Sequence, residues 1–325
     1  MPRVLDPAQI ETFAQRTIPR IRLPEPASVF SVRGARLRRL SEGHAVGDYL
    51  RLMAALTDAQ QDALNALTIA GDQASTAEES GSRKGERLRL AREHGMPPLQ
   101  ASAWSRDERW RAVLNRLCDA IARAPGYPDA VAATCRRIQE TPAAQLEAQA
   151  DLLLGAGPAG VGSDAQIDAS TAPFIMAALQ VYWTRMLASL SHDEVGEHLG
   201  HVDVPGVCPV CGTLPVASIV RAEKAYEGYR YLHCALCATE WHLVRIKCSH
   251  CDSTAGIHYH SIEGGSTAIR AEACDSCKSY RKICYQEHDM DVEPLADDLA
   301  SLALDLLMTE AGFQRASGNP LLWQA

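Results

Sequence analysis

Eight of the eleven cysteines in this chain of 325 residues form four C-x-x-C pairs, and this pattern constrains the fold more than any other feature of the sequence. Between successive pairs lie 22, 10 and 22 residues, so adding 40 to each cysteine position in the first two pairs gives the positions in the last two. A repeat at a fixed offset indicates two equivalent structural modules. The pairs are Cys208 with Cys211, Cys234 with Cys237, Cys248 with Cys251, and Cys274 with Cys277.

Each C-x-x-C pair has the chemistry of half a metal site. Its tight turn aims two thiolates at one point, and backbone N–H groups of the turn donate to the sulfurs. Gly212 suits the left-handed conformation that such a turn often needs. Two turns complete a tetrahedral shell of four sulfurs, which suits Zn2+ or a single iron ion. We therefore expect two closed metal sites, the first made by Cys208, Cys211, Cys234 and Cys237 and the second by Cys248, Cys251, Cys274 and Cys277.

Other cysteine chemistries fit the pattern less well. A thioredoxin-like dithiol needs one such motif in a βαβ setting, and iron–sulfur clusters usually show tighter cysteine runs. The ligand type does not separate iron from zinc, because both accept four thiolates in a tetrahedron. A closed site has no open position for a substrate, so its default role is to hold a small module together. Histidines near the turns are alternative ligands, although each site already has four sulfurs; they are His233, His242, His250, His258 and His260.

Three cysteines lie outside the repeat. Cys118 and Cys135 fall in helical segments, and we expect them in the core, because a free cysteine behaves as a small apolar side chain. Cys284 has no partner in the register and is also expected in the core, with a reactive thiol as the alternative. Trp241 is expected to pack against a metal-binding turn, with a contact to a partner protein as the alternative.

The charge of the chain argues against nucleic-acid binding. The formal net charge is -8, from 32 basic and 40 acidic residues, and residues 201–325 contain 10 basic and 16 acidic residues. A divalent metal with four thiolates carries a net charge of about -2, so two loaded sites bring the chain to about -12. Zinc ribbons often bind nucleic acid, but this one would repel phosphates, and an anionic membrane surface is excluded on the same ground. A protein partner is favoured.

Helical periodicity dominates the first part of the chain, where 46% apolar content overall is sufficient for a large core. Apolar residues recur at helical spacing over 48–70, 110–121, 141–154 and 173–187, and Asp6 to Pro19 carries a helix start and stop. We expect an all-α domain over 1–190, with a polar loop at 71–85 and a linker at 191–207. The basic run Arg33, Arg36, Arg38 and Arg39 is expected to be a solvated helix face, or a docking surface for an acidic partner.

The second part of the chain has the residue composition of short β-strands. Segments 217–220, 229–233, 241–246, 257–262 and 267–272 are rich in β-branched or aromatic residues and are separated by Gly or Cys turns. We expect one metal module over 208–247, a second over 248–290, and a C-terminal region over 291–325 with a helix at 294–310. The predicted fold class is α+β: an all-α N-terminal domain, two tandem β modules of the zinc-ribbon kind, and a C-terminal helix.

The sequence contains no catalytic motif that we can identify. It lacks a Gly-rich phosphate loop, a G-x-S-x-G elbow and an H-E-x-x-H motif, so we expect no enzymatic activity. The N-terminus has no apolar segment of signal-peptide length, and the best membrane candidate, 174–190, contains Gln180 and Arg185. We expect a cytoplasmic protein without a membrane span, in a compartment where thiols stay reduced and bind metals.

Longer stretches around the cysteines resemble a known family. Residues 231–251 read YLHCALCATEWHLVRIKCSHC, and residues 274–282 read CDSCKSYRK. Together with RLRRL at 36–40, the glycine and histidine at 43–44 followed by GDYL at 47–50, and ADDLASLALD at 296–305, these segments resemble the formate dehydrogenase accessory proteins of the FdhE family over nearly the whole chain. The chain departs from the family at Ala45 and Val46, where Pro-Leu is expected, and in its longer polar loop at 71–85.

The resemblance implies a function in enzyme assembly. Members of this family are similar in having a helical N-terminal part and two rubredoxin-like pairs of metal-binding turns, with iron the usual suggestion for the metal. The implied role is that of a cytoplasmic accessory protein, or chaperone, which binds the catalytic subunit of a respiratory formate dehydrogenase before that subunit is exported folded. The alternative is rubredoxin-like electron transfer, in which redox-active iron would reduce or protect the immature partner.

Overall fold

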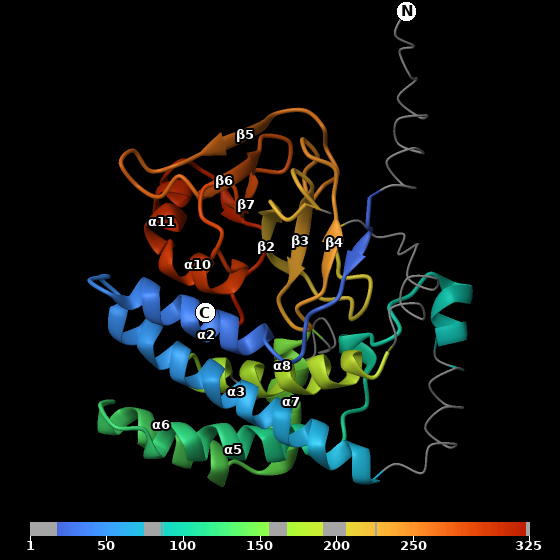
Figure 1. Cartoon of the computed structure of the whole chain (residues 1–325), viewed down its shortest axis with the longest axis vertical. Coiled ribbons are helices and arrows are strands. Elements are labelled where there is room, and N and C mark those ends of the chain that lie inside the picture. The colour runs from blue at the N-terminus through green and yellow to red at the C-terminus, as the bar shows by residue number, and fades with distance from the viewer. Residues whose placement is uncertain are drawn as a thin grey trace, which may run out of the picture.

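The computed structural model describes residues 18–74, 86, 88–155, 168–190, 206–224 and 226–322. In this part of the chain, layers of helices lie against one side of a mixed sheet, and the last two helices pack beside the sheet (Figure 1). The α+β fold class is therefore as predicted. The predicted helix at 6–19, most of the polar loop and most of the linker lie outside the described residues.

The helical part contains the helices that apolar periodicity predicts. On α5, the predicted stripe from Trp110 to Ile121 is buried. The helix predicted over 48–70 is α3, which runs to Ala74. The helices are α2 (Val29–Ser41), α3 (Gly47–Ala74), α5 (Arg109–Arg123), α6 (Asp129–Glu140), α7 (Ala143–Leu153) and α8 (Ala172–Ala188), with a 3-10 turn at Ala101–Ala103.

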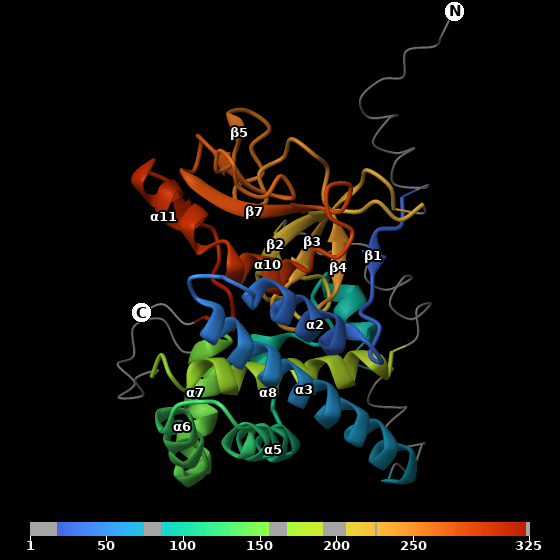
Figure 2. The same ribbon diagram turned by 60° about the vertical axis from the view of Figure 1, so that its left-hand side comes forward.

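Helix α8 lies at the centre of the molecule. It is buried on nearly every face, since it packs against α3, α5 and α7 on one side and faces the sheet on the other (Figure 2). This burial fits a sequence that is apolar at most positions, in which Gln180 and Thr184 are buried as well. Within the described residues, no helix combines the length and the apolar composition needed to cross a bilayer.

Both cysteine-rich modules contribute to one sheet, with the strand order β1-β4-β3-β2-β7-β6-β5. Two antiparallel groups, β4-β3-β2 and β7-β6-β5, meet where β2 and β7 run parallel, with Ile219 opposite Cys284. The strands are β1 (Ile21–Arg22), β2 (Pro215–Val220), β3 (Arg230–Cys234), β4 (Glu240–His242), β5 (Ile257–His260), β6 (Ile269–Cys274), β7 (Ser279–Tyr285) and β8 (Gln314–Arg315), which pairs with β7.

Two strand predictions need correction. Strand β4 ends at His242: Leu243 still donates its N–H to the Arg230 carbonyl of β3, but Ile246 adopts a positive φ of 62°, which a strand residue does not. Strand β7 lies at the centre of the sheet but was not among the predicted strands. Its Arg281 and Lys282 interrupt the apolar pattern, and the structure buries both of them.

The predicted helix at 294–310 is two helices, α10 (Pro294–Ala300) and α11 (Leu302–Glu310). The break at Ser301 has a local cause. The Ser301 hydroxyl donates to the carbonyl of Asp297 at 2.7 Å, and Lys282 Nζ donates to the carbonyl of Asp298 at 2.8 Å. Both carbonyls are thereby occupied by side chains where a continuous helix would use them.

The basic run on α2 is not a solvated face. Arg33 and Arg36 are buried between α2 and the C-terminal region, where Arg33 pairs with Glu293 and Arg36 with Asp297. The last two arginines of the run, Arg38 and Arg39, are exposed. The expectation of a solvated face is therefore wrong for half of the run, and the acidic partner of these two arginines is the chain itself.

Candidate metal centres

The structure brings the eight paired cysteines together in two groups. We call Cys208, Cys211, Cys234 and Cys237 the first cysteine group, and Cys248, Cys251, Cys274 and Cys277 the second. Within each group all four sulfurs lie within 4.8 Å of one another. The grouping is the one that the spacing predicts.

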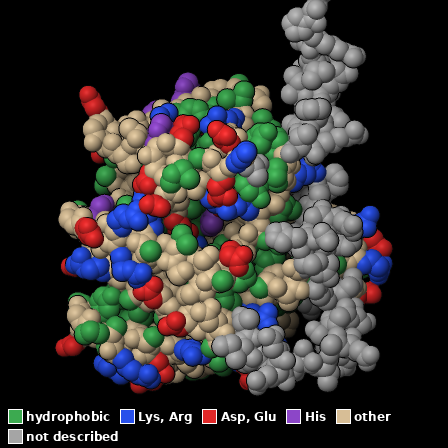
Figure 3. Space-filling model, viewed as in Figure 1, with side chains coloured by type: hydrophobic (Ala, Val, Ile, Leu, Met, Phe, Trp, Pro, Cys, Tyr) green, Lys and Arg blue, Asp and Glu red, His purple; other side chains and the backbone are tan. Residues whose placement is uncertain are grey.

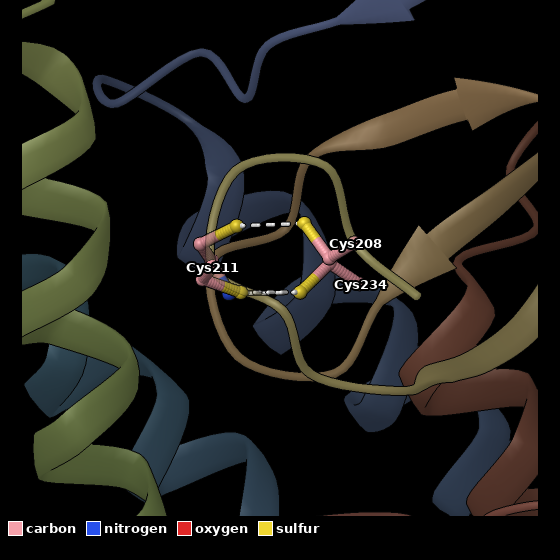
Figure 4. Close-up of side chains that lie close together, drawn as sticks. Cys208, Cys211 and Cys234 are labelled. Atoms are coloured by element: carbon pink, nitrogen blue, oxygen red, sulfur yellow. Dashed lines mark hydrogen bonds between the residues drawn. The ribbon is translucent and has the colours of Figure 1, made fainter. Parts of the chain in front are cut away.

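Sulfur separations in both groups fit a metal tetrathiolate. The Sγ atoms of Cys208 and Cys237 lie 3.6 Å apart, and those of Cys211 and Cys234 lie 3.4 Å apart (Figure 4). In the second group, the corresponding distances are 3.8 Å and 3.7 Å. A tetrahedron with metal–sulfur bonds of about 2.3 Å has edges of about 3.8 Å, whereas a disulfide needs about 2.05 Å. The residues present therefore fit a tetrahedrally bound ion.

The two groups are geometrically equivalent. In each group, the first cysteine of one turn faces the second cysteine of the other turn across 29 residues, and the remaining two face each other across 23 residues. The register offset of 40 residues therefore corresponds to a structural repeat. It is a repeat of geometry more than of sequence.

Every turn is followed by a residue in the left-handed region. These residues have φ between 54° and 74°, and they are Gly212, Ala238, Asp252 and Lys278. The expectation for Gly212 is confirmed, but three of the four turns accept a side chain at this position. At Gly212 a Cβ atom would lie 2.8 Å from the end of the Gln100 side chain, which is able to move aside, so the positive φ of 74° is the main reason that glycine is favoured there.

A hydroxyl residue follows two positions after every turn, a feature that the cysteine spacing alone does not predict. Thr213, Thr239 and Ser279 place their Oγ atoms 3.1, 3.1 and 2.8 Å from the sulfur of the preceding cysteine. Ser253 instead contacts Ser276 at 2.9 Å. Because each threonine is matched by a serine 40 positions later, identity matching does not detect the pattern, but a C-x-x-C-x-[ST] pattern occurs at all four turns. Such hydrogen bonds orient and tune metal ligands.

Backbone N–H groups also donate to the sulfurs, as the turn geometry predicts. The N–H groups of Leu236 and Cys237 both lie 3.3 Å from the sulfur of Cys234. At Cys274, burial alone would raise the pKa of the thiol, but N–H groups of Cys277 and Ser276 donate to it and hold its pKa at about 7. These contacts favour the thiolate form that binds metal.

The two groups differ in their exposure. All four cysteines of the first group are fully buried and belong to the same apolar core as the helices. In the second group, Cys251 is exposed and Cys277 is half-buried. The first group is therefore enclosed by protein, whereas one edge of the second group faces solvent.

Contacts from the helical part hold the first cysteine group in place. The N–H groups of Leu99 and Ala101 each donate at 2.9 Å to carbonyls of the turn, at Val210 and Cys211. From α8, Trp183 Nε1 donates to the Leu99 carbonyl at 3.0 Å, and Gln180 Nε2 donates to the Ala235 carbonyl at 2.8 Å. The geometry of this group thus depends on α8 and on the segment around Leu99, which lies more than 100 residues away in sequence.

The remaining cysteines are buried, as expected. Cys118 and Cys135 form a hydrogen bond to each other between α5 and α6, and this bond together with burial raises the pKa of Cys118. Burial likewise raises the pKa of Cys284 well above its usual value, so its thiol is not a reactive nucleophile.

Trp241 is buried in the core that contains the first cysteine group. The histidines near the turns belong to neither cysteine group.

A cleft of 460 Å3 lies between α2 and the first module, close to the first cysteine group. Figure 3 shows this hollow, with acidic and basic side chains around it. Its walls include the exposed side chains of Val32 and Met290, and Ala238 lines it directly after Cys237. On its inner side, Arg221 Nε donates to Glu240 at 3.0 Å. The helical part and the metal-binding part thus form one shared surface here.

Three family models match the chain in succession. They are described as "FdhE, N-terminal" over residues 18–199, "FdhE, central domain" over 207–245 and "FdhE, C-terminal domain" over 246–322. The boundary between the second and third models falls between the two cysteine-rich modules, close to Cys248.

Relatives match over almost the full length. The chain is 39% identical to the protein FdhE homolog of Cronobacter sakazakii and 37% identical to the protein FdhE of Salmonella paratyphi A, in each case over 99% of this chain and 97% of the relative. The crystal structure of the FdhE protein from Pseudomonas aeruginosa is similar, with a TM-score of 0.76 and 39% identity, over 94% of this chain and 99% of that one.

Proposed function

The chain belongs to the FdhE family, and we propose that it is an accessory factor in the maturation of a formate dehydrogenase. The observation that carries this proposal is the pair of four-cysteine groups, whose sulfur separations of 3.4 to 3.8 Å fit two closed metal sites in a chain that resembles the family from end to end. Closed sites offer no position for a substrate, so they favour a role in assembly over one in catalysis.

The metal ions would be held by the eight paired cysteines. In the first group, burial and the contacts from α8 favour a structural ion that fixes the joint between the helices and the sheet. Zinc and iron both suit four thiolates, and the family resemblance favours iron. We place the protein in the cytoplasm, where reduced thiols bind metal.

The partner in this proposal is the catalytic subunit of the formate dehydrogenase, and the cleft beside α2 is its docking surface. Val32 and Met290 line the cleft and expose 54% and 58% of their surface, so a partner would cover apolar area there. The charged side chains around the cleft are largely neutralised within the chain, since Arg39 pairs with Asp291 and Arg221 with Glu240. The docking surface therefore depends on both parts of the molecule.

Co-purification tests the role of the metal groups. Changing Cys234 and Cys237 to Ser removes two ligands of the first group, and we expect loss of one metal equivalent and of co-purification with the catalytic subunit. Cys284→Ala is the matched control, because this cysteine is buried but binds no metal in the proposal. Undiminished co-purification after loss of the metal would contradict the proposal.

Surface variants test the docking surface separately. Val32→Glu and Met290→Glu each place a charge in the lining of the cleft, and each should weaken binding of the purified catalytic subunit by about tenfold or more. Leu306→Glu is the control, because Leu306 is equally apolar, 67% exposed and remote from the lining residues. Equal effects of all three variants would locate the docking surface elsewhere.

Electron transfer is a second candidate, favoured by the exposure of Cys251 at the edge of the second group. In that role, iron in the second group would alternate between the ferrous and ferric states and exchange electrons through the exposed edge. Metal analysis of anaerobically purified protein distinguishes the electron-transfer role from the assembly role. Stoichiometric zinc in both groups would exclude electron transfer and leave the assembly role intact.

A further inference from the structure

One buried cation lacks a carboxylate partner. Six basic residues other than histidine are buried in the described part of the chain, and five of them form an ion pair with Asp or Glu. Arg281, only 3% exposed, forms none. The five pairs are Arg33 with Glu293, Arg36 with Asp297, Arg221 with Glu240, Arg230 with Glu272, and Lys282 with Asp305.

All hydrogen-bond partners of Arg281 are neutral. Its Nε donates to the hydroxyl of Ser249 at 2.8 Å, and its Nη1 donates to the carbonyl of Pro215 and to the hydroxyl of Ser317. Burial and the nearby guanidinium groups of Arg230 and Arg315 lower the pKa of Arg281 to about 9. Glu272 lies opposite Arg281 in the β6–β7 register, but its carboxylate pairs with Arg230 at 2.7 Å, so one buried carboxylate serves two buried guanidinium groups. An excess of buried positive charge is costly, and additional negative charge beside Arg281 would reduce this cost.

The second cysteine group is placed to supply that charge. Ser249, which accepts from Arg281, lies in the turn between Cys248 and Cys251, and Arg281 borders the small cavity that Cys248 and Cys274 also line. Four thiolates with a divalent metal carry a net charge of about -2. The guanidinium and the loaded group would therefore each lower the desolvation cost of the other.

We propose that Arg281 is the internal counter-ion of the metal centre formed by the second cysteine group. This inference rests on the proposed metal binding and adds a residue that does not touch the metal. It acts by charge, and through Ser249 it also positions the turn. The first group lacks this feature, because the residue 40 positions earlier is Trp241. The inference thus predicts an asymmetry between two centres of otherwise equal geometry.

Cobalt titration against a competing chelator tests the proposal at constant pH. Wild-type protein should bind two equivalents of Co2+, with the absorption of a tetrahedral thiolate site. In Arg281→Gln and Arg281→Met, affinity for the second-group equivalent should fall by about tenfold or more, as for other residues that support metal ligands, while the other equivalent keeps its affinity. Arg281→Lys retains the charge and should restore most of the lost affinity. Two neutral variants are used so that one that does not fold leaves the other for comparison.

A double-mutant cycle assigns the effect to the second group. Cys251→Ser removes an exposed ligand of that group, and adding Arg281→Gln should then cause no further loss at the remaining equivalent. Equal weakening of both equivalents, unchanged affinity in the neutral variants, or no rescue by Arg281→Lys would overturn the counter-ion inference while the metal-binding proposal stands. Failure of the wild-type protein to bind Co2+ in either group would overturn both.

Discussion

Arg36 on α2 and Asp297 on α10 form a two-point ion pair although 261 positions separate them in the sequence. Arg36 Nε donates to Oδ2 at 2.9 Å and Nη2 donates to Oδ1 at 2.6 Å, and both side chains are buried. Asp289 accepts a further contact from Arg36 at 2.7 Å. This pair joins the helical part of the chain to the region that follows the second cysteine group.

Arg36→Met should destabilise the protein strongly. Burial raises the pKa of Asp297 even with Arg36 beside it, so the pair adds little net stability, but removal of the arginine leaves an unpaired buried carboxylate. Breaking a buried pair in this way costs about 3 to 5 kcal/mol. Urea unfolding of the metal-loaded protein measures the loss.

Two further variants separate burial from charge. Arg39→Met removes an exposed partner of Asp291 on the same helix and should cost less than about 1 kcal/mol. The double variant Arg36→Met with Asp297→Leu removes both charges and should recover much of the stability. If the double variant is as unstable as Arg36→Met alone, the stranded carboxylate is not the cause.

The sequence predicts the cysteine groups well because their information is local and repeated. Four turns with one spacing rule determine which sulfurs meet, and the structure shows these same pairings. The burial of Arg36 could not be predicted in this way. Its partner, Asp297, lies in a different region of the chain, and a basic residue on a helix is usually solvated. Only the tertiary contact therefore distinguishes a buried, paired arginine from a solvated one.

Strand β7 likewise could not be predicted from the local sequence. Its seven residues include Arg281 and Lys282, and a local pattern of charges argues against a central strand. The charges are buried because Asp305 on α11, Ser249 in its turn and Ser317 after β8 supply partners from elsewhere in the chain. Propensity therefore located strands β2 to β6, but neither β7 nor its parallel contact with β2, which merges the two modules into one sheet.

Removing the hydroxyl beside a metal ligand should weaken metal binding. Thr239→Val and Ser279→Ala each delete a contact to the sulfur of the preceding cysteine, and the loss of such support typically reduces affinity about tenfold or more. Ser253→Ala is the matched control, because its hydroxyl contacts Ser276 and the Ala255 carbonyl. Competition with a chelator provides the affinities, and equal losses in all three variants would contradict the prediction.

A chelator should remove the two metal ions at different rates. Cys251 is exposed, so a chelator can attack the second group in the folded protein, whereas the first group is buried among helices and must open first. We expect two phases of release, with the fast phase absent from Cys251→Ser protein. Mild urea should accelerate only the slow phase. A single phase for both ions would show that exposure does not control release.

Stability should fall as the pH decreases below about 4, and Asp298 should account for part of the fall. Burial would raise the pKa of Asp298, but Lys282 and Arg315 outweigh it and lower the pKa below the ordinary value of about 3.9. Because the folded state then binds fewer protons than the unfolded state, the stabilisation from Asp298 is present above this value and is lost as the pH falls through the folded pKa.

Asp298→Asn should reduce the unfolding free energy near neutral pH by about 3 kcal/mol and flatten its dependence on pH below 5. Asp291→Asn, at an exposed carboxylate, should leave both unchanged, and an unaltered slope in Asp298→Asn would exclude this residue as the source.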